Sequence, residues 1–516
     1  MQPAKRVIKN TGFLYGRMVI TIFISLYSTR LILNALGEVD YGIFNLIGGV
    51  IAMLSFINGA MIIATQRYLS IHLGAGDAKK LKSVFSSSII LHLIISLIIV
   101  LLLETGGFFL FNGGLNIPAD RIGTAKIIFH FMVISTFFTI NAVPYDASIN
   151  SHENMLFDAL LGILESITKL GIAIWLVYSG FDKLILYGLL TAALTIIIRL
   201  VKSIYCSRKY EECRLSFKLN IDIGLLKEMV SFAGWNVFGL FCSVLKSQGL
   251  AILLNLFFGI VVNAAYGIAN TVNSNIRAFS TNMIRAILPQ ITKSEGSGDR
   301  QRMLRLSVFE SKMSFFLLAF FAIPIIVEMP FVLKIWLKSV PENAIIFCQL
   351  ILVISLIYQI TVGMMAAITS VGNIKVFQIV VGAVEIFNLP FAYALVKFGL
   401  ASYWVFVGLI FLEVIAGGLK IWFAHKVAGL DINDFLIKTI MNSIISVAIA
   451  VVFASIIRYL LPEGFLRVIG VGFVSTMSLI ISVRYIALTS GENEKIRETV
   501  LSLYYNARKI LLIKNS

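Results

Sequence analysis

Five basic residues of this 516-residue chain stand inside long apolar stretches, where a cation is costly. They are Arg17, Arg30, Lys169, Lys246 and Arg277. A cation near the centre of a membrane-spanning helix costs about 2.5–3.5 kcal/mol on insertion scales, so each is expected to have a function or a compensating partner. A guanidinium can bind two phosphate oxygens at once. These residues therefore predict a site for a phosphate-bearing anion.

Polar side chains recur with helical spacing around three of these cations. At 100° per residue, the three stripes are Arg17, Thr21, Ser25 and Ser28; Asn236, Ser243, Lys246 and Ser247; and Asn270, Asn273, Ser274, Arg277 and Thr281. We expect Arg17 and Arg277 to line one central cavity with Lys246 near by. Arg30 is a further candidate, on a different helix face from Arg17. The alternative is structural: each cation reaches a membrane interface or pairs with a buried acid.

Three acidic residues in the same stretches complete the candidate set. Glu165 and Lys169 are four residues apart, a spacing that predicts an ion pair within one helix, and the alternative role is a proton or ion relay. Glu385 and Glu413 have no partner nearby in the sequence. They could titrate during transport or neutralise cations of the cavity.

Motifs for catalysis are missing from the sequence. There is no Gly-x4-Gly-Lys-Ser/Thr motif for ATP, and His152-Glu153 lacks the second histidine of a zinc helix. The four cysteines form no Cys-x-x-Cys pair. We therefore expect neither an enzyme, nor a metal site, nor a bound cofactor.

The elements that position these residues are expected to be membrane helices, which makes the fold class all-α and polytopic. Apolar residues make up 58% of the chain and charged residues only 14%, whereas soluble domains are about a quarter charged. Fourteen stretches reach the roughly 20 residues that a span needs. They are 11–36, 41–65, 84–103, 122–143, 155–178, 183–205, 228–257, 262–288, 307–329, 343–369, 374–396, 401–424, 436–460 and 465–487.

The basic residues fix the expected orientation. With the N-terminus inside, 30 Lys and Arg residues fall in cytoplasmic segments and 8 in exterior ones. This bias predicts that both termini are cytoplasmic. The net charge of +16 does not indicate nucleic-acid binding, because the basic residues lie in short segments between spans.

The chain carries one signature twice, once in each half. Gly74-Ala75-Gly76-Asp77 recurs as Gly296-Ser297-Gly298-Asp299, and at nearly the same offset Tyr41-Gly42-Ile43 recurs as Tyr266-Gly267-Ile268. The recurrence predicts two six-helix bundles, 1–222 and 223–428, related by a pseudo-two-fold axis along the membrane normal. Residues 429–516 would add two helices and a cytoplasmic tail.

Several short segments resemble one family. They are Lys9-Asn10-Thr11, Ser25-Leu26-Tyr27, Leu36-Gly37, Asp40-Tyr41-Gly42, Arg67-Tyr68 and the Gly-x-Gly-Asp turn. The chain resembles the polysaccharide flippases of the O-antigen (Wzx) type, which share the MOP superfamily with the multidrug and toxin extrusion (MATE) exporters and the lipid II flippases. The turn is common to the superfamily, and the Asp-Tyr-Gly context favours the polysaccharide branch.

The resemblance implies a flippase of the bacterial cytoplasmic (inner) membrane that works by alternating access. Its substrate would be an undecaprenyl-pyrophosphate-linked oligosaccharide for O-antigen or capsule. We expect a proton or sodium gradient to drive it, and membrane lipids, a polysaccharide polymerase and a chain-length regulator as partners. One alternative is a MATE-like exporter of drugs or cations, which would need unpaired acids in its cavity. Another is a membrane-embedded polysaccharide polymerase, although those carry a larger exterior loop.

Overall fold

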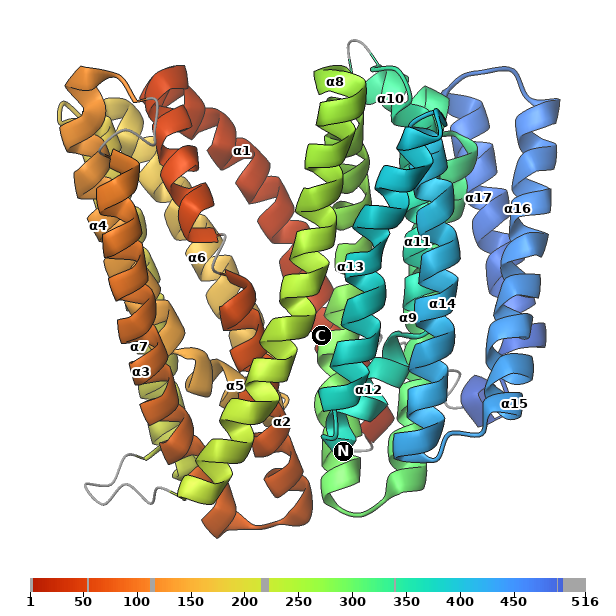
Figure 1. Ribbon diagram of the computed structural model, residues 1–516, viewed down its shortest axis with the longest axis horizontal. Coiled ribbons are helices and arrows are strands. Elements are labelled where there is room, and N and C mark those ends of the chain that lie inside the picture. Colours follow the sequence, from red (N-terminus) through yellow and green to blue (C-terminus); the bar gives the residue numbers. More distant parts are fainter. Residues whose placement is uncertain are drawn as a thin grey trace, which may run out of the picture. The chain divides into compact units, whose positions relative to one another are not determined.

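The computed structural model is built from helices, with no β-strand in the residues that it describes (Figure 1). Those residues are 3–52, 55–111, 117–214, 222–337, 340–489 and 491–494. The predicted all-α class is confirmed. It follows from the length of the apolar stretches, since a helix satisfies every backbone polar group within one segment of lipid-facing chain. The predicted tail beyond residue 494 lies outside the described residues.

The helices form two compact units. The N-terminal unit comprises residues 12–240 and 296–298, and the C-terminal unit comprises residues 1–11, 241–295 and 299–516. The boundaries at 1–222, 223–428 and 429–516 stay a prediction.

The α-helices described in the N-terminal unit come mainly from the first half of the chain. They are most of α1 (Pro3–Ala52), α2 (Ser55–Ala75), α3 (Ala78–Phe109), α4 (Ile122–Asn141), α5 (Val143–Ser151), α6 (Met155–Tyr178) and α7 (Lys183–Lys209). The core lies where α3, α4 and α7 pack together, around the buried side chains of Ile128 and Phe129. Glycines allow this approach: a Cβ at Gly107 would lie 2.5 Å from the Phe129 ring, and one at Gly188 would lie 3.1 Å from Ile128.

Helix α8 (Ile223–Gly296) is divided between the two units, and residues 241–295 of it belong to the C-terminal unit. Its other helices are α9 (Arg300–Val327), α10 (Met329–Trp336), α11 (Ala344–Gln359), α12 (Val362–Val371), α13 (Lys375–Lys397), α14 (Tyr403–Ala428), α15 (Ile432–Phe435), α16 (Asn442–Leu460) and α17 (Phe465–Ser482). Helix α9 is central, because α11, α12, α16 and α17 all pack against it.

Helices α16 and α17 are the two additional helices predicted after the second repeat, and they lie side by side at one edge of the C-terminal unit (Figure 1). Buried polar contacts tie them and the segment that follows to α9. Arg467 of α17 pairs with Glu328 at the end of α9, at 2.8 Å. The Lys312 ammonium of α9 donates to the Ala487 carbonyl at 3.3 Å and lies 3.2 Å from Glu492.

The expected number of fourteen spans stays a prediction, because length and hydropathy identify fewer candidate spans among the described residues. Among the described residues, 11 helices meet both requirements, or 12 if the bent pair α11 and α12 forms one span. The stretches 41–65 and 262–288 are the two that do not qualify. The first stretch includes residues 53 and 54, which lie outside the described residues, and the second is the more polar part of α8, which contains Arg277 and Arg285.

The two copies of the Gly-x-Gly-Asp signature have the same backbone conformation. Gly76 and Gly298 both have positive φ, at 71° and 79°, and each precedes an aspartate that caps the next helix. Asp77 accepts from the Lys80 N–H, and Asp299 accepts from the Arg302 N–H. A second pair of glycines, separated in the sequence by the same interval, breaks α1 and α8: Gly37 has φ 76° and ψ 172°, and Gly259 has φ 82° and ψ −178°.

Replacing Gly259 with alanine is expected to destabilise the protein by about 1–3 kcal/mol, because this backbone region is accessible almost only to glycine. The matched control is Gly267→Ala in the regular part of the same helix, where no atom lies within 4 Å of the added Cβ. The control should be neutral or stabilising by up to about 1 kcal/mol. Thermal unfolding of the purified proteins in detergent measures both, and equal melting temperatures would contradict the assignment of strain to Gly259.

Arg121 joins three segments at one end of the N-terminal unit. Its Nε donates to Asp40 at 2.9 Å and its Nη1 donates to Asp182 at 2.7 Å. Asp182 also caps α7 through the Leu184 and Ile185 N–H groups. Although partial burial acts in the opposite direction, the Ile185 N–H and the Arg121 guanidinium lower the pKa of Asp182. Asp40 of the Asp-Tyr-Gly segment thus has a structural role.

Candidate functional site

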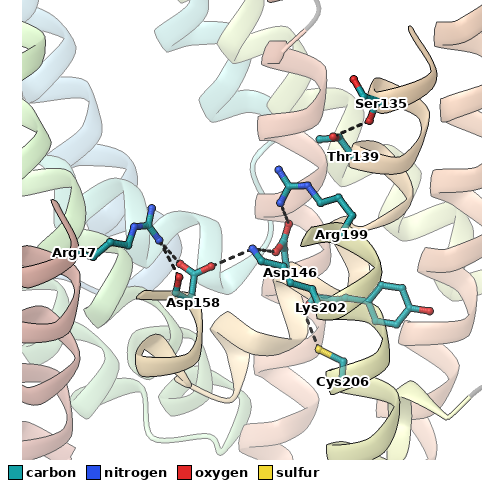
Figure 2. Close-up of polar contacts among 9 residues, drawn as sticks. Arg17, Ser135, Thr139, Asp146, Asp158, Arg199, Lys202 and Cys206 are labelled. Carbon is teal, nitrogen blue, oxygen red and sulfur yellow. Dashed lines mark hydrogen bonds and ion pairs between the residues drawn. The ribbon is translucent and has the colours of Figure 1, made fainter. Parts of the chain in front are cut away.

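Five charged residues of the N-terminal unit form one connected network, which we call the N-terminal cluster (Figure 2). Arg17 of α1 pairs with Asp158 of α6 at 2.6 Å. The other oxygen of Asp158 lies 3.1 Å from the Lys202 ammonium of α7, which lies 2.6 Å from Asp146 of α5. Arg199 completes the network, with its NH1 3.5 Å from Asp146.

Local sequence explains how Arg17 reaches this network. Asp158 and Gly162 are one turn apart on α6, so they share a helix face. A Cβ at Gly162 would lie 2.9 Å from the Cδ and Nε atoms of Arg17, which shows that the arginine side chain crosses α6 over this glycine. A larger residue at position 162 would push the guanidinium away from Asp158.

The N-terminal cluster holds three cations and two carboxylates. Lys202 and Asp158 are almost completely buried, with 9% and 6% of their side chains exposed. Burial of charges in an apolar interior is tolerated only with paired partners, and both are paired here. The remaining positive charge makes the cluster attractive to an anion.

The C-terminal unit contains a second group of charges, the C-terminal cluster, made of Lys246, Arg277, Glu385, Glu413 and Lys420. Lys246 of α8 pairs with Glu385 of α13, and Lys420 pairs with Glu413 along α14 at 3.1 Å. Glu413 also lies within electrostatic range of Lys246. The two ion pairs therefore belong to one polar region.

The Tyr358 ring of α11 brings Arg277 into the same cluster. The Arg277 guanidinium carbon lies 4.9 Å from the ring centroid, and the Lys420 ammonium lies 4.4 Å from it. One turn earlier on each helix, the Ser355 hydroxyl donates to Asn273 at 2.6 Å. The polar stripe of α8 thus faces α11. Within the described residues no carboxylate pairs with Arg277, whose side chain is partly exposed.

The other candidates lie outside these clusters. Glu165 and Lys169 form the ion pair that their spacing predicts, at 2.7 Å on an exposed part of α6. Arg30 is exposed on α1. Arg17 and Arg277 belong to different units, so their position around one cavity stays a prediction.

Several members of the clusters were not singled out from the sequence. They are Asp146, Asp158, Arg199, Lys202, Tyr358 and Lys420. Three lysines assigned to cytoplasmic segments, Lys202, Lys312 and Lys420, are instead buried within helices. Asp146 and Asp158 could have been noticed, because each is an acid near an apolar run. Their partners could not, because these lie far away along the chain.

The described part of the chain has no group of three or more His, Cys, Asp or Glu residues arranged to hold a metal ion. All four cysteines are buried free thiols. The arrangement that remains is one of fixed charges inside apolar helical units, which is suited to binding a charged ligand.

No protein-family model matches the sequence, and no curated protein matches it either. Solved structures are similar. A multidrug resistance MATE family transporter of the MOP superfamily, in an outward-facing conformation, has a TM-score of 0.71 at 14% identity, covering 83% of this chain and 97% of that one. A MATE transporter from Vibrio cholerae has a TM-score of 0.65 at 17% identity, covering 83% and 98%.

A third similar structure is a MOP superfamily transporter from Pyrococcus furiosus, with a TM-score of 0.68 at 14% identity, covering 84% of this chain and 97% of that one. In that transporter, reverse polarity of the binding pocket suggests a different function. Together these similarities establish that this chain has the fold of MATE transporters. With its apolar helices, it is a multi-pass membrane protein. The polysaccharide branch stays a prediction.

Proposed function

We propose that the protein is a flippase that moves an undecaprenyl-pyrophosphate-linked oligosaccharide across the bacterial cytoplasmic membrane by alternating access. The product would serve the synthesis of a surface polysaccharide, either O-antigen or capsule. The observation that carries the proposal is Arg277, a partly exposed guanidinium on a membrane helix with no carboxylate partner among the described residues. A pyrophosphate group would supply the negatively charged partner that the Arg277 guanidinium lacks among the described residues.

The sign of the charge clusters supports the same substrate class. Each cluster has three cations and two carboxylates, so each retains one positive charge. Glu385 and Glu413 are paired with lysines, which favours the role of neutralising cations over that of binding a cationic drug. Arg17 and Lys246 are the other residues proposed to contact the substrate. Each also forms an ion pair within the protein, Arg17 with Asp158 and Lys246 with Glu385.

Other properties of the flippase belong to the proposal. The orientation with both termini cytoplasmic rests on the distribution of Lys and Arg. A proton or sodium gradient would drive the cycle, and a polysaccharide polymerase and a chain-length regulator would act on the product.

The second candidate function is export of cationic drugs, which is favoured by the MATE transporters among the similar structures. At 14% and 17% identity these establish the fold and not the substrate. Unpaired acids exposed to a cavity would support this function, whereas the unpaired group described on α8 is an arginine.

Reconstitution in liposomes separates the two functions. Purified full-length protein is combined with a fluorescent undecaprenyl-pyrophosphate-linked oligosaccharide, and a lectin outside the vesicles reports sugar that reaches the outer leaflet. We expect the outer leaflet to gain sugar faster than in protein-free vesicles, with no movement of ethidium. Ethidium transport without sugar movement would overturn the proposal in favour of the exporter.

A further inference from the structure

Glu310 is a buried acid that neither charge cluster uses. It lies on α9 within the C-terminal unit, and its side chain is completely inaccessible. Neither of its carboxyl oxygens has a hydrogen-bond partner in the described part of the chain. Acids deep in a membrane protein are uncommon and usually functional, so an isolated one needs an explanation.

Other deeply buried acids of the protein have cations beside them. Glu413 pairs with Lys420, Glu328 with Arg467 and Asp158 with Lys202. Lys312 is only two residues from Glu310, but that spacing places it on the opposite face of the helix, where it contacts Ala487 and Glu492. Glu310 therefore lacks the compensation that the other acids have.

In the described part of the chain, no charged residue on the helices packed around α9 pairs with Glu310. Helix α12 has no titratable residue, and none of the others forms an ion pair or hydrogen bond with Glu310 among the described residues. The titratable residues on the surrounding elements are Cys242, Lys246, Tyr266, Arg277, Arg285, Lys293 and Glu295 on α8, Lys334 on α10, Cys348 and Tyr358 on α11, Arg458 and Tyr459 on α16, Arg467 on α17, and Arg484, Tyr485, Glu492 and Glu494 in the segment that follows α17. On α9 itself they are Arg300, Arg302, Arg305 and Lys312.

Helix α12 packs closely against α9 beside Glu310, at Ser307 and Ser311. A Cβ at Gly363 would lie 1.8 Å from the Ser307 carbonyl oxygen, and the Gly363 N–H donates to Ser311 at 3.0 Å. One turn beyond Glu310, the Ser314 hydroxyl is likewise buried without a partner among the described residues. An ionised carboxylate here would cost far more than a neutral acid, because no group of the described residues hydrogen-bonds to it.

From this geometry we infer that Glu310 is a proton-binding site. Its carboxyl group holds one proton as the neutral acid while α9 is packed against α12, and releases it only when these helices separate and admit water. The ligand is a single proton, and its release is therefore tied to a rearrangement of the C-terminal unit. The inference goes beyond the proposed function and does not depend on the identity of the substrate.

The first repeat has a buried titratable residue in a related place. Ser88 follows Asp77 at the same interval as Glu310 follows Asp299, and His92 occupies the position equivalent to Ser314. His92 is also completely buried on α3, with its Nδ1 2.6 Å from the Ser88 carbonyl and its Nε2 without a partner in the described residues. Each helix that follows a Gly-x-Gly-Asp turn thus carries one such group.

Infrared spectroscopy of the full-length protein in lipid bilayers tests the proton on Glu310 directly. A protonated carboxyl without hydrogen bonds gives a carbonyl band that is separate from those of amides and carboxylates. We expect the wild type to have this band at neutral pH and Glu310→Gln to lose it. The matched control is Glu165→Gln, which removes a carboxylate paired with Lys169 and should leave the band unchanged. A spectrum of Glu310→Gln identical to that of the wild type would overturn the inference.

A second measurement uses only the wild-type chain, so its result can be interpreted even if the Glu310→Gln variant folds poorly. A lipid-soluble carbodiimide reacts with protonated buried carboxyl groups, and mass spectrometry locates the adduct. We expect the adduct on Glu310 and none on Glu413, which is paired with Lys420. Failure to modify Glu310, with modification of other acids, would count against the site. Neither measurement involves a sugar lipid, so the proposed flippase function can fail without affecting this result.

Discussion

Arg277→Ala is expected to abolish surface polysaccharide without reducing the abundance of the protein. The side chain contacts the Tyr358 ring, a cation–π interaction that contributes only about 0.5–2 kcal/mol, and no carboxylate in the described residues depends on it. A charge-assisted contact to a phosphate oxygen contributes about 1.5–3 kcal/mol, so its loss weakens binding roughly 10- to 100-fold. Transport should therefore suffer much more than folding.

Matched variants separate charge from geometry. Arg277→Lys should retain part of the activity, because the charge remains while the bidentate contact is lost. Arg458→Ala removes an exposed arginine of α16 and should leave both activity and abundance unchanged. Polymer can be measured on cells and the protein by immunoblot. Wild-type polymer from a well-expressed Arg17→Ala, Arg277→Ala double variant would refute the proposed substrate site.

The architecture could be predicted from the sequence because its signals are local. Apolar stretches predict helices, and the recurring Gly-x-Gly-Asp segments correspond to turns in which Gly76 and Gly298 have positive φ. The breaks at Gly37 and Gly259 fall between predicted stretches, 11–36 and 41–65 in one half and 228–257 and 262–288 in the other, although the sequence did not single out these glycines. Length and hydropathy alone identify 11 or 12 candidate spans among the described residues, because polar side chains lower the mean hydropathy of a segment such as 262–288.

The candidate site was predictable only where partners are close in the chain. The i,i+4 spacing of Glu165 and Lys169 gave the correct pair, since both lie on one face of α6. Lys246 and Glu385 lie on different helices far apart in the sequence, and only the packing of α8 and α13 brings them together. Glu310 was missed for the opposite reason. Its importance depends on the absence of a partner among the described residues, which a sequence cannot reveal.

Glu413→Ala should be among the most destabilising single substitutions in the C-terminal unit. The Lys420 side chain is only 3% exposed, and its ammonium lies 3.1 Å from the Glu413 carboxylate. The substitution removes this carboxylate and leaves the buried ammonium without its ion-pair partner. Removing one partner of a buried ion pair typically costs about 3–5 kcal/mol. Part of the charge remains stabilised by the Tyr358 ring, so the lower half of this range is the expectation. Thermal unfolding in detergent measures the loss.

Removing both charges at once distinguishes the cost of an orphaned cation from the value of the pair. Glu413→Leu combined with Lys420→Met keeps apolar volume in place, and buried pairs replaced in this way are often neutral or more stable. We therefore expect the double variant to recover most of the stability that Glu413→Ala loses. If it unfolds as readily as the single variant, the pair itself stabilises the fold. If it is stable but inactive in the sugar-flipping assay, the pair is needed for transport, which would add Lys420, beside Arg277 at the Tyr358 ring, to the residues proposed to contact the substrate.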